Sequence, residues 1–230
     1  MPFIVIDELL EIYDGSNGEN LDDDQINVYA QEWLHKNNYE PTEVFSLVFE
    51  KRHLPKWSSL LAFLYCYGIG TETDEHEMFK YYKYAAEADD MVAQNQLGWC
   101  YAHGHGVDVD WETAFNWFQS SASKGCIISE GNTFAQNQLG YFYQDGIATE
   151  RSVAKAYYWY TKAISGKNTA ALYNVALLYQ GGLGVPVDIH LAIRFYRLAI
   201  NEKVDKAYTL DLSELICLQA SDVNAWYTTL

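Results

Sequence analysis

The sequence predicts an all-α fold, a solenoid of four tandem helical hairpins. One segment recurs four times, from Trp57, Ala93, Ala135 and Ala171, at intervals of 36, 42 and 36 residues. Each copy is followed by a second segment whose apolar residues are spaced as on one face of a helix. Only 4 prolines occur among 230 residues, so long stretches of the chain are free to be helical.

The first helix of each hairpin, the A helix, follows from the two best-preserved copies. A-Q-N-Q-L-G begins at Ala93 and recurs unchanged from Ala135. A tyrosine and a glycine follow at fixed positions in every copy, and the glycine can take the left-handed conformation that ends a helix. These residues are Tyr65, Tyr101, Tyr143 and Tyr179, and Gly68, Gly104, Gly146 and Gly182.

The second helix, the B helix, begins after residues that suit a helix N-cap, and Glu77 is placed to complete a capping box with the first of them. Small and aromatic residues then share one face, so that two helices can approach closely while the rings fill the space between units. The caps are Asp74, Asp110, Ser152 and Asp188, the small-residue row is Met78, Ala114, Ala156 and Ala192, and the aromatic row is Tyr81, Trp117, Trp159 and Phe195.

The array needs terminal caps, because the apolar faces of a hairpin can be covered only by its neighbours. Three helices are expected before it, around Asp7–Tyr13, around Asp24–Asn37 and from Pro41 to about Arg52, with an acidic, turn-rich linker between the first two. Six extra residues around 127–132 lengthen a loop between the second and third hairpins. Ala207 lies 36 residues beyond the start of the fourth copy, which predicts a degenerate fifth A helix.

The combined pattern A-x-x-x-L-G-x-x-Y-x-x-G-x-G, then D-x-x-x-A-x-x-W-Y-x-x-A, resembles the Sel-1-like repeat, a relative of the tetratricopeptide repeat, over roughly 55–202. The resemblance implies a right-handed α/α superhelix with helical caps at both ends. The first unit departs from the pattern, with Ala62 for the usual glycine and Met78 for the usual small residue. Ala148 replaces the second loop glycine of the third unit, which implies a differently shaped loop.

Three parts follow from this organisation. Residues 1–53 form an N-terminal helical cap or docking segment, and residues 205–230 form a degenerate C-terminal capping helix and tail. Residues 54–204 form four repeats, at about 57–92, 93–134, 135–170 and 171–204. The N-terminal stretch is similar to segments that precede Sel-1-like arrays in fungal proteins, some of which follow a protein kinase domain. The chain itself lacks the H-R-D, D-F-G and strand-borne lysine motifs of a kinase.

The charge of the chain narrows the choice of partner. The net charge is −16 and the pI is about 4.6, so phosphate backbones and anionic lipid surfaces are repelled while basic protein segments are attracted. No stretch approaches the ~18 apolar residues of a membrane span, and no signal peptide is recognised. The four cysteines form no C-x-x-C pair. We therefore expect a cytoplasmic or nuclear protein with reduced thiols.

A catalytic or metal site has one candidate. His103 and His105 are two residues apart and could share a metal, for which Asp108 and Asp110 are the local further ligands. The alternative is that these residues lie in a variable loop and bind no metal. No Ser/His/Asp or Cys/His grouping is visible, so no cofactor is predicted and the chain is expected not to be an enzyme. A metal-dependent enzyme is the alternative that the histidines leave open.

A binding groove is predicted on the A helices, which line the concave surface in helical-hairpin solenoids. The first row offers side-chain amides that can bind a peptide backbone, and the second offers large apolar anchors. The alternative is that these rings pack in the interior or against a terminal segment of the chain. The first row is Ser59, Asn95, Asn137 and Tyr173, the second row is Phe63, Trp99, Tyr141 and Leu177, and the third is Cys66, Ala102, Gln144 and Gln180.

These rows predict an adaptor or scaffold that binds a peptide or helix of a partner protein. The alternative function is a regulatory module of a signalling protein, such as a kinase, with the N-terminal helices docking on that protein. The predicted groove residues are Ser59, Phe63, Asn95, Trp99, Asn137, Tyr141, Gln144, Tyr173 and Leu177.

Overall fold

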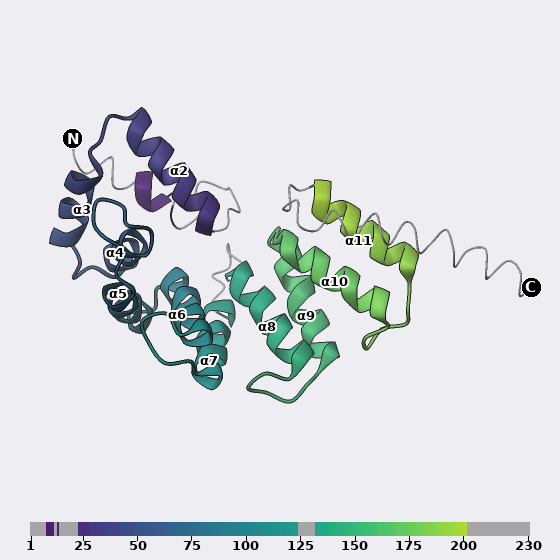
Figure 1. The fold of residues 1–230 in the computed structure, drawn as a ribbon. Coiled ribbons are helices and arrows are strands. Elements are labelled where there is room, and N and C mark those ends of the chain that lie inside the picture. The colour runs from purple at the N-terminus through teal and green to yellow at the C-terminus, as the bar shows by residue number, and fades with distance from the viewer. Residues whose placement is uncertain (1–7, 12, 14–22, 124–131, 202–230) are drawn as a thin grey trace, which may run out of the picture. The chain divides into compact units, whose positions relative to one another are not determined.

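The computed structural model describes residues 8–11, 13, 23–123 and 132–201. All regular structure in these residues is helical, as predicted (Figure 1). The chain divides into two compact units, Met1–Asn132 and Thr133–Leu230, and each is described by itself. The predicted fifth A helix, the C-terminal tail and most of the loop extension at 127–132 lie outside the described residues.

Unit 1 contains the first two hairpins, preceded by helical residues 8–11 and 13 and by two further helices. Each A helix packs most extensively on its own B helix, and α5 joins one hairpin to the next (Figure 1). The predicted N-terminal helices are confirmed where they are described. The helices are α2 (Asp23–Lys36), α3 (Pro41–Glu50), α4 (Pro55–Tyr67), α5 (Glu75–Glu87), α6 (Met91–His103) and α7 (Trp111–Ser123).

Unit 2 contains the third and fourth hairpins. The A helix of each packs on its B helix, and α9 contacts α10 between the hairpins. The helices are α8 (Thr133–Asp145), α9 (Val153–Ser165), α10 (Thr169–Gly181) and α11 (Ile189–Asn201).

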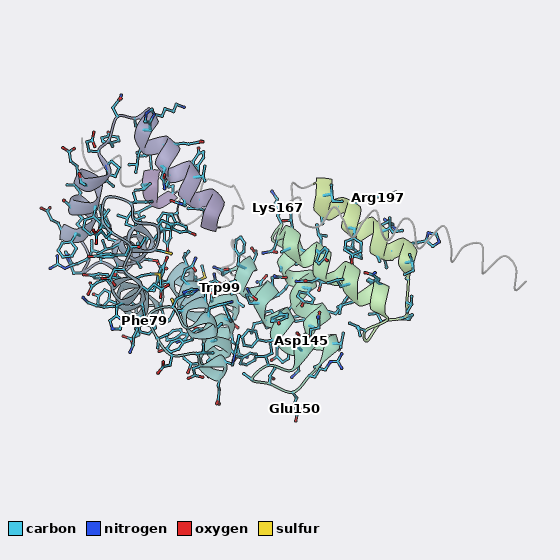
Figure 2. All side chains as sticks on the ribbon, viewed as in Figure 1. Phe79, Trp99, Asp145, Glu150, Lys167 and Arg197 are labelled. Atoms are coloured by element: carbon cyan, nitrogen blue, oxygen red, sulfur yellow. The ribbon has the colours of Figure 1, made fainter. Side chains whose placement is uncertain are left out.

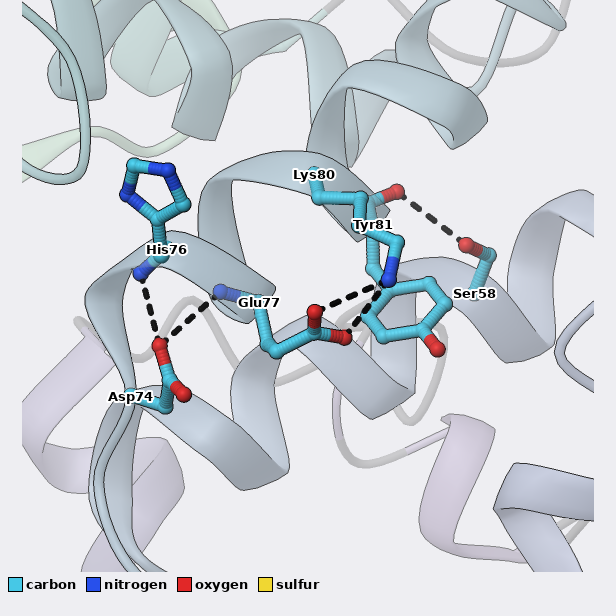
Figure 3. Close-up of polar contacts among 6 residues, drawn as sticks. All are labelled: Ser58, Asp74, His76, Glu77, Lys80 and Tyr81. Atoms are coloured by element: carbon cyan, nitrogen blue, oxygen red, sulfur yellow. Dashed lines mark hydrogen bonds and ion pairs between the residues drawn. The ribbon is translucent and has the colours of Figure 1, made fainter.

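The B helices begin where the sequence predicted. The Asp74 carboxylate accepts hydrogen bonds from the backbone N–H groups of His76 and Glu77, at 2.9 and 3.0 Å (Figure 3). The side chains of the equivalent residues Asp110, Ser152 and Asp188 accept comparable bonds from the first turns of their helices.

The predicted capping box is wrong. Glu77 contacts Lys80 at 2.8 Å instead of reaching back to Asp74, as Figure 3 shows. The backbone N–H of Asp74 donates to the carbonyl of Tyr65 at 3.2 Å, so this donor already has an acceptor without the Glu77 side chain. The same cap-to-tyrosine bond recurs in the other three hairpins, from Asp110, Ser152 and Asp188 to Tyr101, Tyr143 and Tyr179.

On the B helices, the most buried rings lie one residue beyond the predicted aromatic row, which is only partly buried except at Tyr81. They face the small residue in the middle of the A helix. A Cβ added to Gly140 would meet the Tyr160 ring at 2.3 Å, and one added to Gly98 would meet Phe118 at 2.8 Å. Close approach of the helix pair therefore depends on this position. The buried rings are Tyr82, Phe118, Tyr160 and Tyr196.

The loop of the third hairpin keeps the conformation of the others, contrary to the sequence prediction. Ala148 has φ +54°, in the left-handed region, where the equivalent Gly70, Gly106 and Gly184 have φ between +67° and +73°. The geometry of the A–B connection therefore fixes this backbone conformation even where the residue is not glycine.

Candidate functional site

Two predicted groove residues of the first hairpin are covered by the N-terminal segment of the chain. The Tyr13 hydroxyl lies 2.8 Å from Ser59 Oγ, and the rings of Tyr13 and Phe63 are 5.2 Å apart. Ser59 and Phe63 are accordingly 0% and 1% exposed. The prediction that they are open to a partner is wrong, because Leu9 and Tyr13 pack onto this part of α4 as core.

The second hairpin presents one buried and one partly exposed residue of the groove set. Asn95 is only 6% exposed, so it is not an open groove amide, and its Oδ1 accepts no hydrogen bond from any residue that the structure describes. Trp99 is half-buried on α6 (Figure 2). Its ring stacks on the imidazole of His103 at 4.1 Å, so one face of the indole is already in contact.

In unit 2 the groove residues of the third hairpin differ in how far they are engaged. Tyr141 is 42% exposed, and its pKa is raised by lost hydration and by the Asp145 carboxylate. Asn137 Oδ1 accepts a hydrogen bond of 2.9 Å from Asn174. The Gln144 side chain accepts from the Tyr160 hydroxyl at 3.1 Å, so it supports the hairpin.

The fourth-hairpin residues pack against their own B helix. The rings of Tyr173 and Tyr196 are 5.2 Å apart, and Leu177 is partly buried against the cluster that contains Tyr196. Tyr141 is therefore the most exposed large side chain of the predicted set in unit 2.

A cavity of about 220 Å³ opens in unit 1, beside Trp99, between the first two hairpins. Buried apolar side chains lie on one side of it, since Met78, Tyr82 and Cys100 are only 3–5% exposed. Glu75 and His105 are half-exposed and contact each other at 3.1 Å between Oε1 and Nδ1. The lining residues are Tyr65, Cys66, Tyr67, Thr73, Asp74, Glu75, Met78, Tyr82, Gln96, Trp99, Cys100 and His105.

The buried cysteine of this cavity, Cys100, is unsuited to act as a thiolate. Burial, together with Cys66 and Glu75 nearby, raises the pKa of Cys100 to about 12, so this thiol is protonated near neutral pH. Metal ions and electrophiles react with the thiolate form. Cys66 is exposed. The cavity therefore presents a neutral wall on the Cys100 side.

The candidate metal ligands do not converge. Asp110 caps α7, with bonds from Glu112 and Thr113, and hydrogen bonding to Thr113 lowers the pKa of its carboxyl. His103 stacks on Trp99, and its ring lies 6.0 Å from that of His105, which contacts Glu75. Throughout the described part of the chain, no group of three or more His, Cys, Asp or Glu side chains is placed to hold a metal ion.

Several residues that shape the site were missed from the sequence. Tyr67 and Tyr82 line the cavity, and Tyr13 covers the first hairpin. The role of Tyr82 could have been predicted from the sequence, because an aromatic residue recurs at its position in all four hairpins. The contact of Tyr13 with Ser59 could not, since a contact between residues 46 positions apart does not follow from periodicity.

Comparisons with known proteins agree with this architecture. The Sel1 repeat matches residues 59–90, 92–126, 133–168 and 169–203. A Sel1 repeat protein from Oxalobacter formigenes superimposes with a TM-score of 0.70 and 27% identity, over 79% of this chain and 71% of that one. The protein c5321 from uropathogenic Escherichia coli, a protective antigen with an SLR fold, superimposes with a TM-score of 0.64 and 22% identity, over 94% of this chain and 49% of its own length.

A search of curated proteins found no match to the chain. In the described residues, no helix is long and apolar enough to cross a membrane.

Proposed function

Since the chain belongs to the Sel1 repeat family, whose repeats are generally protein-interaction modules, we propose that it is a non-enzymatic scaffold that binds a segment of a partner protein. In each unit, the binding surface is the one that carries the second-row residues on the A helices. The observation that supports this choice is the exposure of Tyr141, a large aromatic side chain that is 42% accessible in the middle of an A helix. Tyrosine and tryptophan, together with arginine, are enriched among the residues that contribute most to binding at protein interfaces.

In unit 1, the corresponding anchor is Trp99. Its indole is half-buried and supported on one side by His103, so little side-chain freedom is lost when a partner covers the remaining surface. Ser59 and Phe63 are not part of the face while Tyr13 covers them.

The partner segment that fits this chain is basic. With a net charge of −16, the chain attracts cationic segments at long range and repels anionic ones. A regulatory role beside a kinase rests on the similarity of the N-terminal stretch alone, and we keep it as the alternative form of the same scaffold function.

Site-directed photocrosslinking tests the proposed face. A photoreactive phenylalanine analogue is placed at Trp99 or Tyr141, and at Tyr158 as a matched control, because Tyr158 is a tyrosine that is 53% exposed on the B helix α9. We expect the same partner protein to be crosslinked from both A-helix positions but not from Tyr158. The partner, once purified, should also bind the unmodified chain.

Two results would contradict the proposal. In the first, the same protein is crosslinked equally from Tyr158. In the second, alanine at either Trp99 or Tyr141 unfolds the chain in thermal denaturation followed by circular dichroism, which would make these rings core rather than interface.

A further inference from the structure

The cavity between the first two hairpins combines an aromatic lining with a carboxylate at its edge. Tyr67, Tyr82 and Trp99 contribute rings, and Glu75 contributes a side chain that is 62% exposed. Aromatic faces attract cations through their quadrupole, and the attraction grows when the cation loses water. A carboxylate beside such rings adds a charge-assisted hydrogen bond.

The size of the cavity suits a single side chain better than a drug-sized ligand or cofactor. Sites for drug-sized ligands or cofactors measure about 300–1,000 Å³, whereas this cavity has about 220 Å³. Its buried apolar residues, Met78 and Cys100, favour contact with methylene groups. A long side chain with an apolar stem and a charged end satisfies both parts of the lining.

The carboxylates of the cavity are not equivalent. Asp74 accepts two backbone hydrogen bonds as the cap of α5 (Figure 3), so its carboxylate already stabilises the start of that helix. Glu75 is held at 3.1 Å by the exposed side chain of His105, a nitrogen donor that an incoming cation can displace. Glu75 is therefore the group that a ligand cation can pair with.

We infer that this cavity binds the lysine or arginine side chain of a basic partner segment, with the stem against Trp99 and Tyr67 and the cationic end at Glu75. The inference rests on the proposed function and adds the chemical class of the residue that anchors the partner. The charge of the whole chain acts in the same direction, because −16 favours a basic segment over an acidic or neutral one.

The test is an NMR titration of the full chain with single capped amino acids. The probes are Nα-acetyl-lysine methylamide, Nα-acetyl-arginine methylamide and the neutral Nα-acetyl-norleucine methylamide, followed through the indole N–H signal of Trp99. We expect at least one cationic probe to shift this signal and to bind about tenfold more tightly than norleucine, the factor that cation–π and ionic contacts supply at a desolvated site.

Paired variants locate the effect. Glu75→Gln should weaken the cationic probes about tenfold, whereas Glu77→Gln should leave them unchanged. Glu77 carries the same charge on the same helical turn, but it pairs with Lys80 (Figure 3). It is not part of the cavity lining. Because Glu75 is exposed, its substitution leaves the fold intact.

Three outcomes would overturn the inference: equal binding of norleucine, equal effects of the two substitutions, or no shift of the Trp99 signal by any probe. Each of them leaves the photocrosslinking result unaffected. Conversely, if the chain binds the cationic probes but crosslinks to no partner, the inference about the cavity stands and the proposed scaffold function is refuted.

Discussion

Replacing Gly140 by alanine tests whether the hairpins are locked by close contact between helices. An added Cβ would meet Cε1 of the buried Tyr160 ring at 2.3 Å, whereas ordinary contact begins near 3.4 Å, so the ring must retreat by about 1.1 Å. It has little room to do so, because Tyr160 is 0% exposed and its hydroxyl donates to Gln144.

Two opposing terms set the magnitude of the effect. Overpacking a core costs about 1–3 kcal/mol, and the tight, tethered ring places Gly140→Ala at the upper end. Alanine regains about 1 kcal/mol over glycine inside a helix. We therefore expect a net loss of about 2 kcal/mol in the free energy of unfolding. At Gly98 the nearest ring atom lies at 2.8 Å, so the two terms nearly cancel.

Urea unfolding followed by circular dichroism measures both variants. We expect a lower midpoint for Gly140→Ala and little change for Gly98→Ala. Adding Tyr160→Phe to Gly140→Ala should restore part of the loss, because the ring is then released from Gln144. A midpoint for Gly140→Ala at or above that of the unmodified chain would refute the reasoning, because helix propensity would then outweigh the contact.

Three further predictions concern strain, the N-terminal cap and the thiols. In urea unfolding, Ala148→Gly should raise the free energy of unfolding by about 1 kcal/mol, because glycine adopts the left-handed conformation without strain. Gly184→Ala should lower it by at least as much, because the added Cβ would have the same strain and would also meet Val153 at 2.6 Å. Tyr13→Phe should cost about 1 kcal/mol for the lost hydrogen bond and Tyr13→Ala about 3 kcal/mol or more in the same assay; no effect of the alanine would mean that the segment does not dock. Alkylation mapped by mass spectrometry at about pH 8 should modify Cys66 well before Cys100, and equal rates would contradict the burial of Cys100. Because the folded pKa of Cys100, about 12, lies above the reference value of 9.0, the unfolded thiol ionises first as pH rises, so the contribution of Cys100 to stability is present below pH 9.0 and is lost progressively toward pH 12.

The repeat frame could be predicted from the sequence because it depends on local chemistry that recurs in phase. The caps at Asp74 and Asp110 and the left-handed residues at Gly68 and Gly104 each act within one turn of their own position. Four copies of such signals leave little freedom in where the helices begin and end.

The groove could be predicted only in part, because a row of side chains on a helix does not reveal what covers it. Phe63 and Trp99 are equivalent in sequence, yet one is core and the other half-open. The difference is made by Tyr13, which lies 46 residues before Ser59 in the sequence and is separated from α4 by a linker and by the helices α2 and α3. The cavity was missed for a similar reason, since Glu75 and Trp99 belong to different hairpins and line the same cavity only after the hairpins pack.

The central claim is that the chain binds its partner through the second-row residues Trp99 and Tyr141. The affinity of the purified chain for the partner found by crosslinking tests this claim most directly. Isothermal titration calorimetry compares the unmodified chain with Trp99→Ala, Tyr141→Ala and the exposed control Tyr158→Ala. The account predicts that each A-helix variant weakens binding by about tenfold or more while its melting temperature stays close to that of the unmodified chain, and that Tyr158→Ala binds normally. Unchanged affinity in both A-helix variants, or an equal loss in Tyr158→Ala, would contradict it.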